Sequence, residues 1–452
     1  APVRSRAEQP PPSSHRDPGL RQVAEAVEVK TPRGRLDLAG RQRLLQRLGA
    51  EGEASALQRH LSAAADVTPQ PLLAGNRAKL LVDGPATFAA MFQAIDAARH
   101  AVLLESYIVE DAEVTRQLVD RLIAKRRAGL QVGVIYDAVG SIGTPKALFE
   151  RLRAEGVAVC QFNPVHPFER AGYWDINHRD HRKILAIDRQ VAFTGGINIS
   201  AVYASGSFGS ARPRQQQVPL DEGWRDTHVR LQGPAADALD ALVRQNWARQ
   251  GCPALAGEAP PAPSTQRQGD DVVRILPASP DDPQDNPIYA TLLRAIDASR
   301  SSIQLTMAYF APGDDMIDAL CEAAGRGVKV QLILPSVSDF TPVLYAGRGH
   351  YQRLLAAGVE IHELESAVLH AKTAVIDQVV STIGSSNMDW RSFAANDEVN
   401  ALLYGEDFGR DMARLFQADL ARAKRITAQD WADRGLADRG KEWLAKLLER
   451  FW

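Results

Sequence analysis

The order of helices and strands predicted for the first half of the chain returns in the second half. Residues 88–99 have the apolar spacing of an amphipathic helix, and residues 100–109 read as a buried strand. Residues 292–310 repeat this pair, and both helices contain the run Ala-Ile-Asp-Ala. Further matching segments are residues 114–137 and 145–162 in the first half, and residues 323–335 and 351–364 in the second. A duplication of this kind restricts the chain to two copies of one fold.

Strands that alternate with helices of this length predict parallel strands joined by crossover helices. The sequence therefore predicts an α/β fold with two copies of one sheet domain, packed about a pseudo-twofold axis. Residues at equivalent positions in the two copies can then meet at that axis.

Composition suggests where the copies begin and end. The first residues are rich in Pro, Ser and charge, which is typical of a flexible tail, and leucines at helical spacing follow. A Pro-rich stretch between the copies predicts a linker. The expected parts are a tail with short helices at residues 1–68, a first repeat at 69–250, a linker at 251–270, a second repeat at 271–425 and an amphipathic helical segment at 426–452.

One motif occurs once in each copy: a histidine, a lysine two positions later and an aspartate five positions after that. Its residues are His181, Lys183 and Asp188 in the first copy, and His370, Lys372 and Asp377 in the second. Both runs have the apolar content of strands, in which side chains alternate between two faces. The histidine and lysine then share one face, and the aspartate points to the other. We place all six residues in the catalytic set, and expect each aspartate to support the structure by accepting hydrogen bonds.

A turn that ends in asparagine follows each motif at the same distance. Asn198 and Asn387 each lie 17 residues after the motif histidine, and glycines precede them at Gly195, Gly196 and Gly384. Glycine allows the backbone to approach a ligand closely, and an asparagine amide can donate to an anionic oxygen. We expect the two copies to form one pocket for a phosphoryl group, with Asn198 and Asn387 binding phosphate.

Two histidines at one phosphoryl group can divide the steps of a group transfer. A neutral imidazole can attack phosphorus, while a protonated imidazole gives its proton to the departing alkoxide. This chemistry requires no metal and no other cofactor. Asp226 and Glu398, each downstream of its own motif, are candidates to orient the imidazole and raise its pKa, with a surface ion pair as the alternative. We interpret His178 as a structural or rim residue.

Composition argues against several other functions. The formal net charge of −2 provides no overall basic field of the kind that marks a general nucleic-acid binder. The three cysteines, Cys160, Cys252 and Cys321, are scattered singly, which argues against a zinc site or a disulfide scaffold and predicts buried thiols. No apolar run approaches the roughly 20 residues of a membrane-spanning helix.

The duplicated motif resembles the signature of the phospholipase D superfamily, over about residues 71–423. Within that superfamily, residues 195–200, 223–235 and 385–400 look like those of bacterial cardiolipin synthases. The resemblance implies an αβαβα sandwich and a phosphatidyltransferase that makes cardiolipin from phosphatidylglycerol and a second phospholipid. It also implies a covalent phosphatidyl-histidine intermediate, with His181 as the nucleophile and His370 as the acid.

The resemblance further implies contact with a membrane surface and peripheral association with the bacterial inner membrane, on a side that the sequence leaves open. Near the C-terminus an apolar stripe predicts an interfacial helix, with a helix packed on the protein core as the alternative. The stripe consists of Trp443, Leu444, Leu447, Leu448 and Phe451. The long segment between Asn198 and Asp226 predicts a lid or acceptor-binding loop, or an insertion without a role.

The main alternative is a hydrolase of the same superfamily, either a phospholipase D or a phosphodiesterase that acts on nucleic acid. The loops near both motifs mix arginine with acidic residues, so we do not expect a nucleic-acid partner. The sequence leaves open the donor and acceptor lipids, the balance of transfer against hydrolysis, a leader before Ala1 and the oligomeric state.

Overall fold

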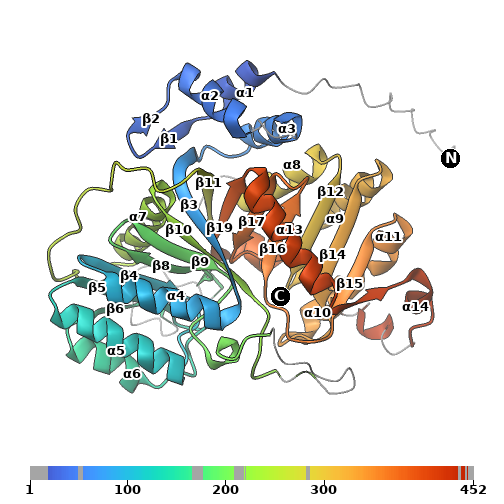
Figure 1. The fold of residues 1–452 in the computed structure, drawn as a ribbon. Coiled ribbons are helices and arrows are strands. Elements are labelled where there is room, and N and C mark those ends of the chain that lie inside the picture. Colours follow the sequence, from blue (N-terminus) through green and yellow to red (C-terminus); the bar gives the residue numbers. More distant parts are fainter. Residues whose placement is uncertain are drawn as a thin grey trace, which may run out of the picture.

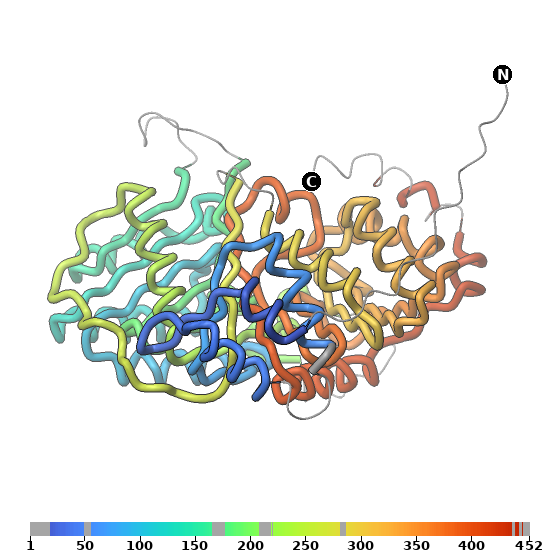
Figure 2. Tube along the Cα trace, turned by 90° about the horizontal axis from the view of Figure 1, so that it is seen from above, coloured from blue at the N-terminus to red at the C-terminus, as the bar shows by residue number. Residues whose placement is uncertain are grey.

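A computed structural model of the protein describes residues 19–48, 54–164, 177–207, 218, 220–280, 286–435, 439–442 and 445. The two repeats lie side by side and follow the same order of elements (Figures 1 and 2). The first contains β3 (Leu72–Val82), α4 (Asp83–Ala97), β4 (Ala101–Ser106), α5 (Glu113–Arg127), β5 (Gln131–Asp137), α6 (Lys146–Ala154), β6 (Ala158–Phe162), β7 (Arg179–Asp180), β8 (Lys183–Ile187), β9 (Val191–Gly195), β10 (Thr227–Gln232) and α7 (Pro234–Arg249). The second contains β11 (Asp271–Ala278), α8 (Pro287–Ala298), β12 (Ser302–Met307), β13 (Phe310–Ala311), α9 (Asp314–Gly325), β14 (Lys329–Pro335), α10 (Thr341–Arg348), α11 (Tyr351–Ala356), β15 (Glu360–Leu364), β16 (Lys372–Ile376), β17 (Val380–Gly384), β18 (Met388–Asp389), α12 (Trp390–Ala394), β19 (Asn396–Tyr404) and α13 (Glu406–Leu420).

The sheets of the two repeats join through strand β3. The C-terminal part of β3 pairs with β10 of its own repeat, and the N-terminal part pairs with β11 of the second repeat. Three strands of each repeat are parallel, β4–β5–β6 and β12–β14–β15, as the sequence predicts. The motif strands β8 and β16 run antiparallel to β4 and β12, because each belongs to a hairpin rather than to a helix crossover.

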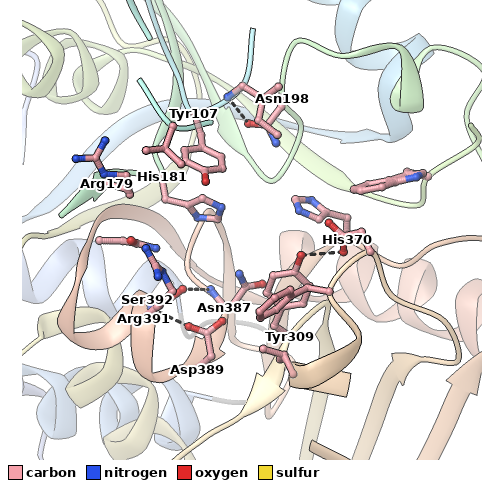
Figure 3. A pocket seen from close by; sticks show the side chains of 17 residues that line it. Tyr107, Arg179, His181, Asn198, Tyr309, His370, Asn387, Asp389, Arg391 and Ser392 are labelled. Carbon is pink, nitrogen blue, oxygen red and sulfur yellow. Dashed lines mark hydrogen bonds between the residues drawn. The ribbon is translucent and has the colours of Figure 1, made fainter. Parts of the chain in front are cut away.

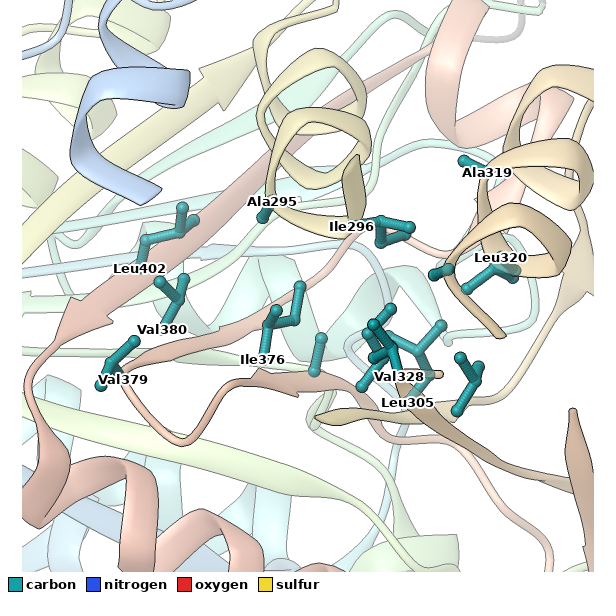
Figure 4. Packing of buried hydrophobic residues seen from close by; sticks show 14 of the residues in the cluster. Ala295, Ile296, Leu305, Ala319, Leu320, Val328, Ile376, Val379, Val380 and Leu402 are labelled. Carbon is teal, nitrogen blue, oxygen red and sulfur yellow. The ribbon is translucent and has the colours of Figure 1, made fainter. Parts of the chain in front are cut away.

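Helices and sheets form five layers, which confirms the predicted two-repeat sandwich. Helices α4 to α6 pack on the outer face of the first sheet. Helices α8 and α9 (Figure 4), together with α11, pack on the outer face of the second. A third apolar cluster lies between the sheets and combines Leu239 and Val243 of α7 with Phe408 and Met412 of α13. Apolar side chains from both sheets join this cluster, so the two repeats share one central core.

The expected N-terminal helices form, and they pack on the body of the protein. Helices α2 (Leu38–Leu48) and α3 (Ala54–Ala65) bury the predicted leucines, among them Leu44 and Leu61. A further helix, α1 (Leu20–Ala26), and strands β1 (Val29–Thr31) and β2 (Gly34–Arg35) complete this module, which lies across the junction of the repeats in Figure 2. Residues 1–18 of the predicted flexible tail lie outside the described residues, and the last two residues of that tail, Leu20 and Arg21, belong to α1. We retain residues 69–250 and 271–425 as the proposed repeats.

The interpretation of the cysteines as isolated buried thiols is wrong for two of the three. Cys160 in β6 and Cys252, just after α7, form a disulfide across 92 residues of sequence. The bond anchors the start of the Pro-rich linker, and the linker continues along the first repeat, where the Gly257 carbonyl accepts a hydrogen bond from Gln131 (3.2 Å). Sequence spacing carries no signal for such a pair, because only the fold brings the two Cα atoms within 5.4 Å.

The C-terminal residues that the structure describes lie on the second repeat. Strand β20 (Ala423–Ile426) pairs with β15, and the ring of Trp431 in α14 (Ala428–Ala432) packs on Tyr351. Ala445 is buried beside Val343 and Ala346 of α10. The five residues of the predicted apolar stripe lie outside the described residues. Among the helices of the described residues, none is long and apolar enough to cross a bilayer.

The aspartate of each motif occupies the tight turn that closes the motif hairpin. Asp188 and Asp377 have φ of 54° and 50°, a left-handed conformation that aspartate tolerates better than most residues. The Asp188 carboxylate accepts hydrogen bonds from the backbone N–H groups of residues 99–101 (2.7–2.8 Å). The Asp377 carboxylate accepts the equivalent bonds from residues 300–302. The expected structural role of the two aspartates therefore agrees with their positions.

Asp377 has additional side-chain partners in the N-terminal module. Arg59 and His60 of α3 contact its Oδ2 atom at 3.2 and 3.0 Å. Burial acts to raise the pKa of Asp377, but the hydrogen bonds from His60 and the backbone of Ser301 and Ser302 outweigh it and hold the pKa well below its usual range. The carboxylate thereby connects the N-terminal module to the second repeat.

We expect Asp377→Ala to destabilise the protein by about 3 kcal/mol, because buried backbone donors and the side chains of Arg59 and His60 in α3 lose their acceptor. Asp188→Ala is the matched control, since it removes the equivalent carboxylate, which accepts hydrogen bonds from backbone N–H groups. Thermal unfolding by calorimetry should show the larger loss for Asp377→Ala. Because the folded pKa of Asp377 is depressed, its stabilisation is present above the ordinary carboxyl pKa near 4 and is lost as the pH falls below it. Equal losses for both variants would contradict a role of α3 in this contact.

Candidate active site

The two motif histidines lie at the interface between the repeats. His181 stands just before β8 and His370 just before β16. The backbone N–H of His181 donates to the carbonyl of Asp397 in the second repeat (2.9 Å), and the N–H of His370 donates to the carbonyl of Arg225 in the first (2.8 Å). Backbone atoms of the opposite repeat therefore hold each histidine in place.

A cavity of about 430 Å³ lies between the histidines and is lined by both repeats (Figure 3). Its lining includes His181, Asn198, His370 and Asn387, four of the residues predicted from the sequence. The two imidazole rings face the same space from opposite repeats in Figure 3. The other lining residues are Tyr107, Ile108, Val139, Arg179, Trp224, Tyr309, Asp339, Phe340, Val343, Asp389, Arg391, Ser392 and Asn396.

The carboxylates that orient the histidines are exchanged between the repeats. Glu398 of the second repeat contacts Nδ1 of His181 at 3.0 Å, and Asp226 of the first repeat contacts Nδ1 of His370 at 2.7 Å. Both carboxylates are fully buried. The expectation that each carboxylate serves its own motif is wrong, because the pseudo-twofold packing turns each one toward the histidine of the other copy. The surface ion pair is excluded by the same contacts.

These contacts define which imidazole nitrogen is free to react. Nδ1 of His181 faces two acceptors, the Glu398 carboxylate and the backbone carbonyl of Ser385 (3.2 Å). Nδ1 therefore carries a proton and donates it, which leaves Nε2 as the atom that can attack or transfer a proton. Asp226, the nearest partner of His370 Nδ1 at 2.7 Å, favours the same arrangement there, although the Lys372 ammonium (3.0 Å) and the Tyr203 hydroxyl (3.1 Å) also contact this nitrogen. The site thus presents two Nε2 atoms to one cavity.

Burial has the largest effect on the pKa of both histidines. It lowers the pKa of His181 although Glu398 acts in the opposite direction. It lowers the pKa of His370 well below the ordinary value, and the charge of Lys372 adds to the effect. The predicted rise in the histidine pKa values is therefore wrong in direction, since desolvation exceeds the attraction of the carboxylates.

The two carboxylates differ in their own protonation. Burial raises the pKa of Asp226 to about 6. Burial also acts to raise the pKa of Glu398, but His181, Lys183 and Ser385 together outweigh it and keep that pKa below the ordinary value. Glu398 therefore keeps its charge over a wider pH range than Asp226 does.

The motif lysines lie behind the histidines. The ammonium of Lys183 donates to the His181 carbonyl (2.5 Å), and that of Lys372 donates to the His370 carbonyl. Neither lysine is among the described residues that line the cavity. Burial lowers the pKa of Lys183 to about 7 and that of Lys372 to about 8. The lysines fix the backbone of the catalytic histidines and contribute positive charge from one layer beneath the cavity.

The asparagines reach the cavity as predicted. Asn198 Oδ1 accepts a hydrogen bond from the Ile108 N–H (3.2 Å). Asn387 Oδ1 is buried and has no hydrogen-bond partner among the described residues. The Asn198 amide donates to the Tyr203 hydroxyl (3.4 Å), and both asparagines line the cavity.

The glycines near the asparagines make room for side chains, not for a ligand. A Cβ atom on Gly196 would lie 2.1 Å from Oδ1 of Asp226, and one on Gly384 would lie 1.9 Å from Oδ1 of Asn400. The predicted close approach of a ligand to these glycines is therefore incorrect. Gly196 permits Asp226 to reach His370.

The remaining predicted positions lie away from the cavity or outside the described residues. Asp188 and Asp377 are at the far ends of the motif strands, so they do not touch the reacting groups. His178 Nε2 donates to Asp397 Oδ1 (3.0 Å), in agreement with the structural one of its two expected positions. Residues 208–217 and 219 of the predicted lid lie outside the described residues. Among the described residues, no group of three or more His, Cys, Asp or Glu side chains is arranged to hold a metal ion.

Sequence reasoning missed several lining residues, including Tyr107 and Tyr309. The Tyr107 ring contacts the His181 ring edge-on, with 5.0 Å between centroids. The Tyr309 ring is also edge-on to the His370 ring, with 6.4 Å between centroids. Both tyrosines follow the first inner strand of their repeat, β4 and β12. Their equivalent positions in the duplication were the signal that could have identified them.

We expect Glu398→Gln and Asp226→Asn each to slow phospholipid turnover by about a hundredfold, because the charge that stabilises the imidazolium is lost. Asp411→Asn on the exposed part of α13 is the matched control. Glu398→Gln should also move the acidic limb of the kcat/KM profile to lower pH, since the carboxylate raises the histidine pKa. An unchanged acidic limb together with normal turnover would contradict this role.

The chain matches known proteins over most of its length. The family described as "Cardiolipin synthase, PLD-like domain" matches residues 91–207 and 292–420. A cardiolipin synthase of Geobacillus kaustophilus is 35% identical over 382 residues, which are 84% of this chain and 73% of the relative. A cardiolipin synthase A of Pseudomonas entomophila is 34% identical over 368 residues, 80% of this chain and 72% of the relative.

A solved structure shares the fold at low sequence identity. A phosphatidylserine synthase of Haemophilus influenzae superposes with a TM-score of 0.60 at 12% identity, covering 87% of this chain and 97% of that one. The family match and the relatives show that the chain belongs to the cardiolipin synthase family, a family of phosphatidyltransferases within the phospholipase D superfamily.

Proposed function

We propose that the protein makes cardiolipin from phosphatidylglycerol and a second phospholipid, through a covalent phosphatidyl-histidine intermediate. The observation that carries this proposal is the pair of buried histidines, one from each repeat, whose Nε2 atoms serve one cavity. The names of the relatives support the choice of product.

The two histidines can complete the transfer in two balanced steps. Nε2 of the first histidine attacks the phosphorus of phosphatidylglycerol, the bond from phosphorus to the glycerol oxygen breaks, and the second histidine gives its proton to that oxygen. Glycerol leaves. The second histidine then removes the proton from a hydroxyl of the acceptor lipid, whose oxygen attacks phosphorus and releases the first histidine. The lysine charges and the asparagine amides stabilise the charge on the phosphoryl oxygens.

The order of the two histidines stays a prediction. The resemblance names His181 as the nucleophile and His370 as the acid. Two features favour the reverse order. Burial favours the neutral form of His370 more strongly than that of His181. His181 faces Glu398, which stays ionised over a wide pH range and so stabilises an imidazolium. Trapping the intermediate separates the two orders.

We expect purified protein incubated with phosphatidylglycerol vesicles to yield cardiolipin and glycerol in equal amounts, because the phosphatidyl group passes from one lipid to another. Mass spectrometry of the lipids and an enzymatic glycerol assay check this outcome. His181→Ala and His370→Ala should each lower turnover by about a thousandfold or more. Phosphatidic acid as the sole lipid product would instead identify a hydrolase.

The same variants test the covalent step. Phosphatidylglycerol labelled in its phosphatidyl group should leave acid-quenched label on the variant that keeps the nucleophile and lacks the proton donor. Label retained by His181→Ala and absent from His370→Ala would overturn His181 as the nucleophile. Absence of label from the wild type and both variants, with cardiolipin still formed, would contradict a covalent intermediate.

We further propose that the rim of the cavity docks on a phospholipid bilayer, as peripheral association with the inner membrane requires. The large apolar side chains that are exposed among the described residues are Ile142, Leu220, Phe340 and Trp390. Exposed apolar side chains grouped in one region are typical of an interaction surface, and aromatic rings suit the membrane interface.

All four side chains are adjacent to the cavity lining. Phe340 itself lines the cavity, and Trp390 lies between the lining residues 389 and 391. The carbonyl of Leu220 accepts a hydrogen bond from the lining residue Trp224 (2.8 Å), and the N–H of Ile142 donates to the lining residue Val139 (3.2 Å). A bilayer at this rim would deliver lipid headgroups directly to the histidines. Since disulfides persist mainly in oxidising compartments, the Cys160–Cys252 bond favours the periplasmic side of that membrane.

We expect the triple variant Ile142→Ser, Leu220→Ser, Trp390→Ser to bind phosphatidylglycerol vesicles about tenfold more weakly in a sedimentation assay, because three apolar anchors are lost. Turnover of short-chain phosphatidylglycerol dispersed as monomers should remain near the wild-type rate. Deletion of residues 440–452 tests the predicted C-terminal helix in the same assay. Normal vesicle binding by the triple variant, and loss on deletion, would assign docking to the C-terminus.

A further inference from the structure

The two ends of the cavity differ in charge although the repeats that build it are copies. Tyr107 and Tyr309 hold equivalent positions beside His181 and His370, and they provide a matched pair for comparing the two ends. Two arginines surround the first tyrosine, and two aspartates surround the second. The duplication supplies the symmetric chemistry, and these four side chains break the symmetry.

The end beside Tyr107 is cationic. Arg179 in β7 and Arg391 in α12 both line the cavity, one from each repeat (Figure 3). Burial, and after it the charge of Asp137, raises the pKa of Tyr107 to about 12, and the guanidinium groups of Arg391 and Arg179 act against that rise. The cationic end therefore adjoins the His181 side of the site.

The two arginines are held differently. The guanidinium of Arg179 donates to the Asn163 carbonyl (3.0 Å) and lies 3.7 Å from the Asp137 carboxylate. Arg391 is partly buried and makes a long hydrogen bond to the Asn177 carbonyl (3.5 Å). No carboxylate of the described residues lies within ion-pair distance of Arg391. Its charge is therefore available to a ligand in the cavity.

The end beside Tyr309 is acidic. The Tyr309 hydroxyl donates to Oδ1 of Asp339 (2.8 Å), and Asp389 also lines the cavity. Burial, and after it the charge of Asp339, raises the pKa of the Tyr309 hydroxyl well above its usual value. A second phosphate would be repelled from this end, whereas a polyol could donate hydrogen bonds to it.

A reaction that joins two phospholipids through one glycerol must hold two phosphodiesters in one cavity. One is the reacting group between the histidines, and the other belongs to the acceptor lipid. A planar guanidinium binds a phosphodiester through paired hydrogen bonds, and it keeps its charge at every physiological pH. Charge complementarity therefore places the second phosphodiester at the arginine end.

We propose that Arg391, assisted by Arg179, forms a subsite for the phosphodiester of the acceptor lipid. This inference rests on the proposed transferase function and adds the means by which an anionic lipid is preferred over water or a neutral alcohol. Bound there, the acceptor holds its free hydroxyl toward the phosphorus on the histidine. Arg391 is a specificity residue in this scheme, because the attack on phosphorus does not depend on it.

The test compares an anionic acceptor with a neutral one. Labelled phosphatidylglycerol serves as donor, either alone, so that it is also the acceptor, or with an excess of 1-butanol, which accepts the phosphatidyl group without offering a phosphate. We expect Arg391→Gln to lower transfer to phosphatidylglycerol by about ten- to a hundredfold relative to transfer to butanol. Arg391→Lys should give an intermediate ratio, because it keeps the charge but loses the paired donors. Arg414→Gln on the exposed part of α13 is the matched control and should keep the wild-type ratio.

Each outcome decides the proposal. An equal loss of transfer to both acceptors in folded Arg391→Gln and Arg391→Lys would overturn the subsite, because a general effect on the site does not discriminate between acceptors. An unchanged ratio would overturn it as well. A wild-type protein that transfers to butanol and never to phosphatidylglycerol would overturn the proposed function itself. The wild type is therefore assayed with both acceptors before the variants.

Discussion

The pairing of each motif histidine with a carboxylate of the opposite repeat is the interaction on which the rest of the site depends. Neither repeat supplies both members of a pair at a motif histidine, since Glu398 orients His181 and Asp226 orients His370. The backbone strengthens the exchange, because each histidine N–H donates to the carbonyl of the residue just before the opposite carboxylate. The site therefore forms only when the repeats pack.

Buried charges flank these pairs and make the packing of the repeats specific. Arg225, which precedes Asp226, is bound by the carboxylates of Asp419 and Asp83. Asp397, which precedes Glu398, is bound by His178 and contacts Arg182 at 3.8 Å. Buried ions are stable only when they are paired, so a displacement of one repeat against the other would leave several of them without partners. The apolar cluster between the sheets supplies the burial that makes the arrangement favourable.

The same duplication explains why the cavity can be both symmetric and selective. Its symmetric part performs the chemistry, because a phosphoryl transfer needs an attacking group and a proton donor on opposite sides of one phosphorus. Its asymmetric part lies in side chains outside the motif, such as Arg391 and Asp339, which sequence copies are free to vary. In the proposed transfer, a duplicated enzyme keeps its reaction while side chains at the ends of the cavity distinguish its two lipid substrates.

The sequence by itself determined the duplication, the α/β class and the set of histidines, lysines and asparagines, because these follow from local periodicity and from spacing that recurs. The αβαβα layering was implied by the family resemblance. The sequence also indicated Asp226 and Glu398 as partners of the histidines. Only the tertiary structure decided which carboxylate serves which histidine, that Gly196 makes room for Asp226, that the lysines lie behind the cavity and that Cys160 meets Cys252. Each of these depends on contacts between residues far apart in the chain. In a duplicated protein, the sequence does not distinguish a partner in the same repeat from the equivalent partner in the other repeat.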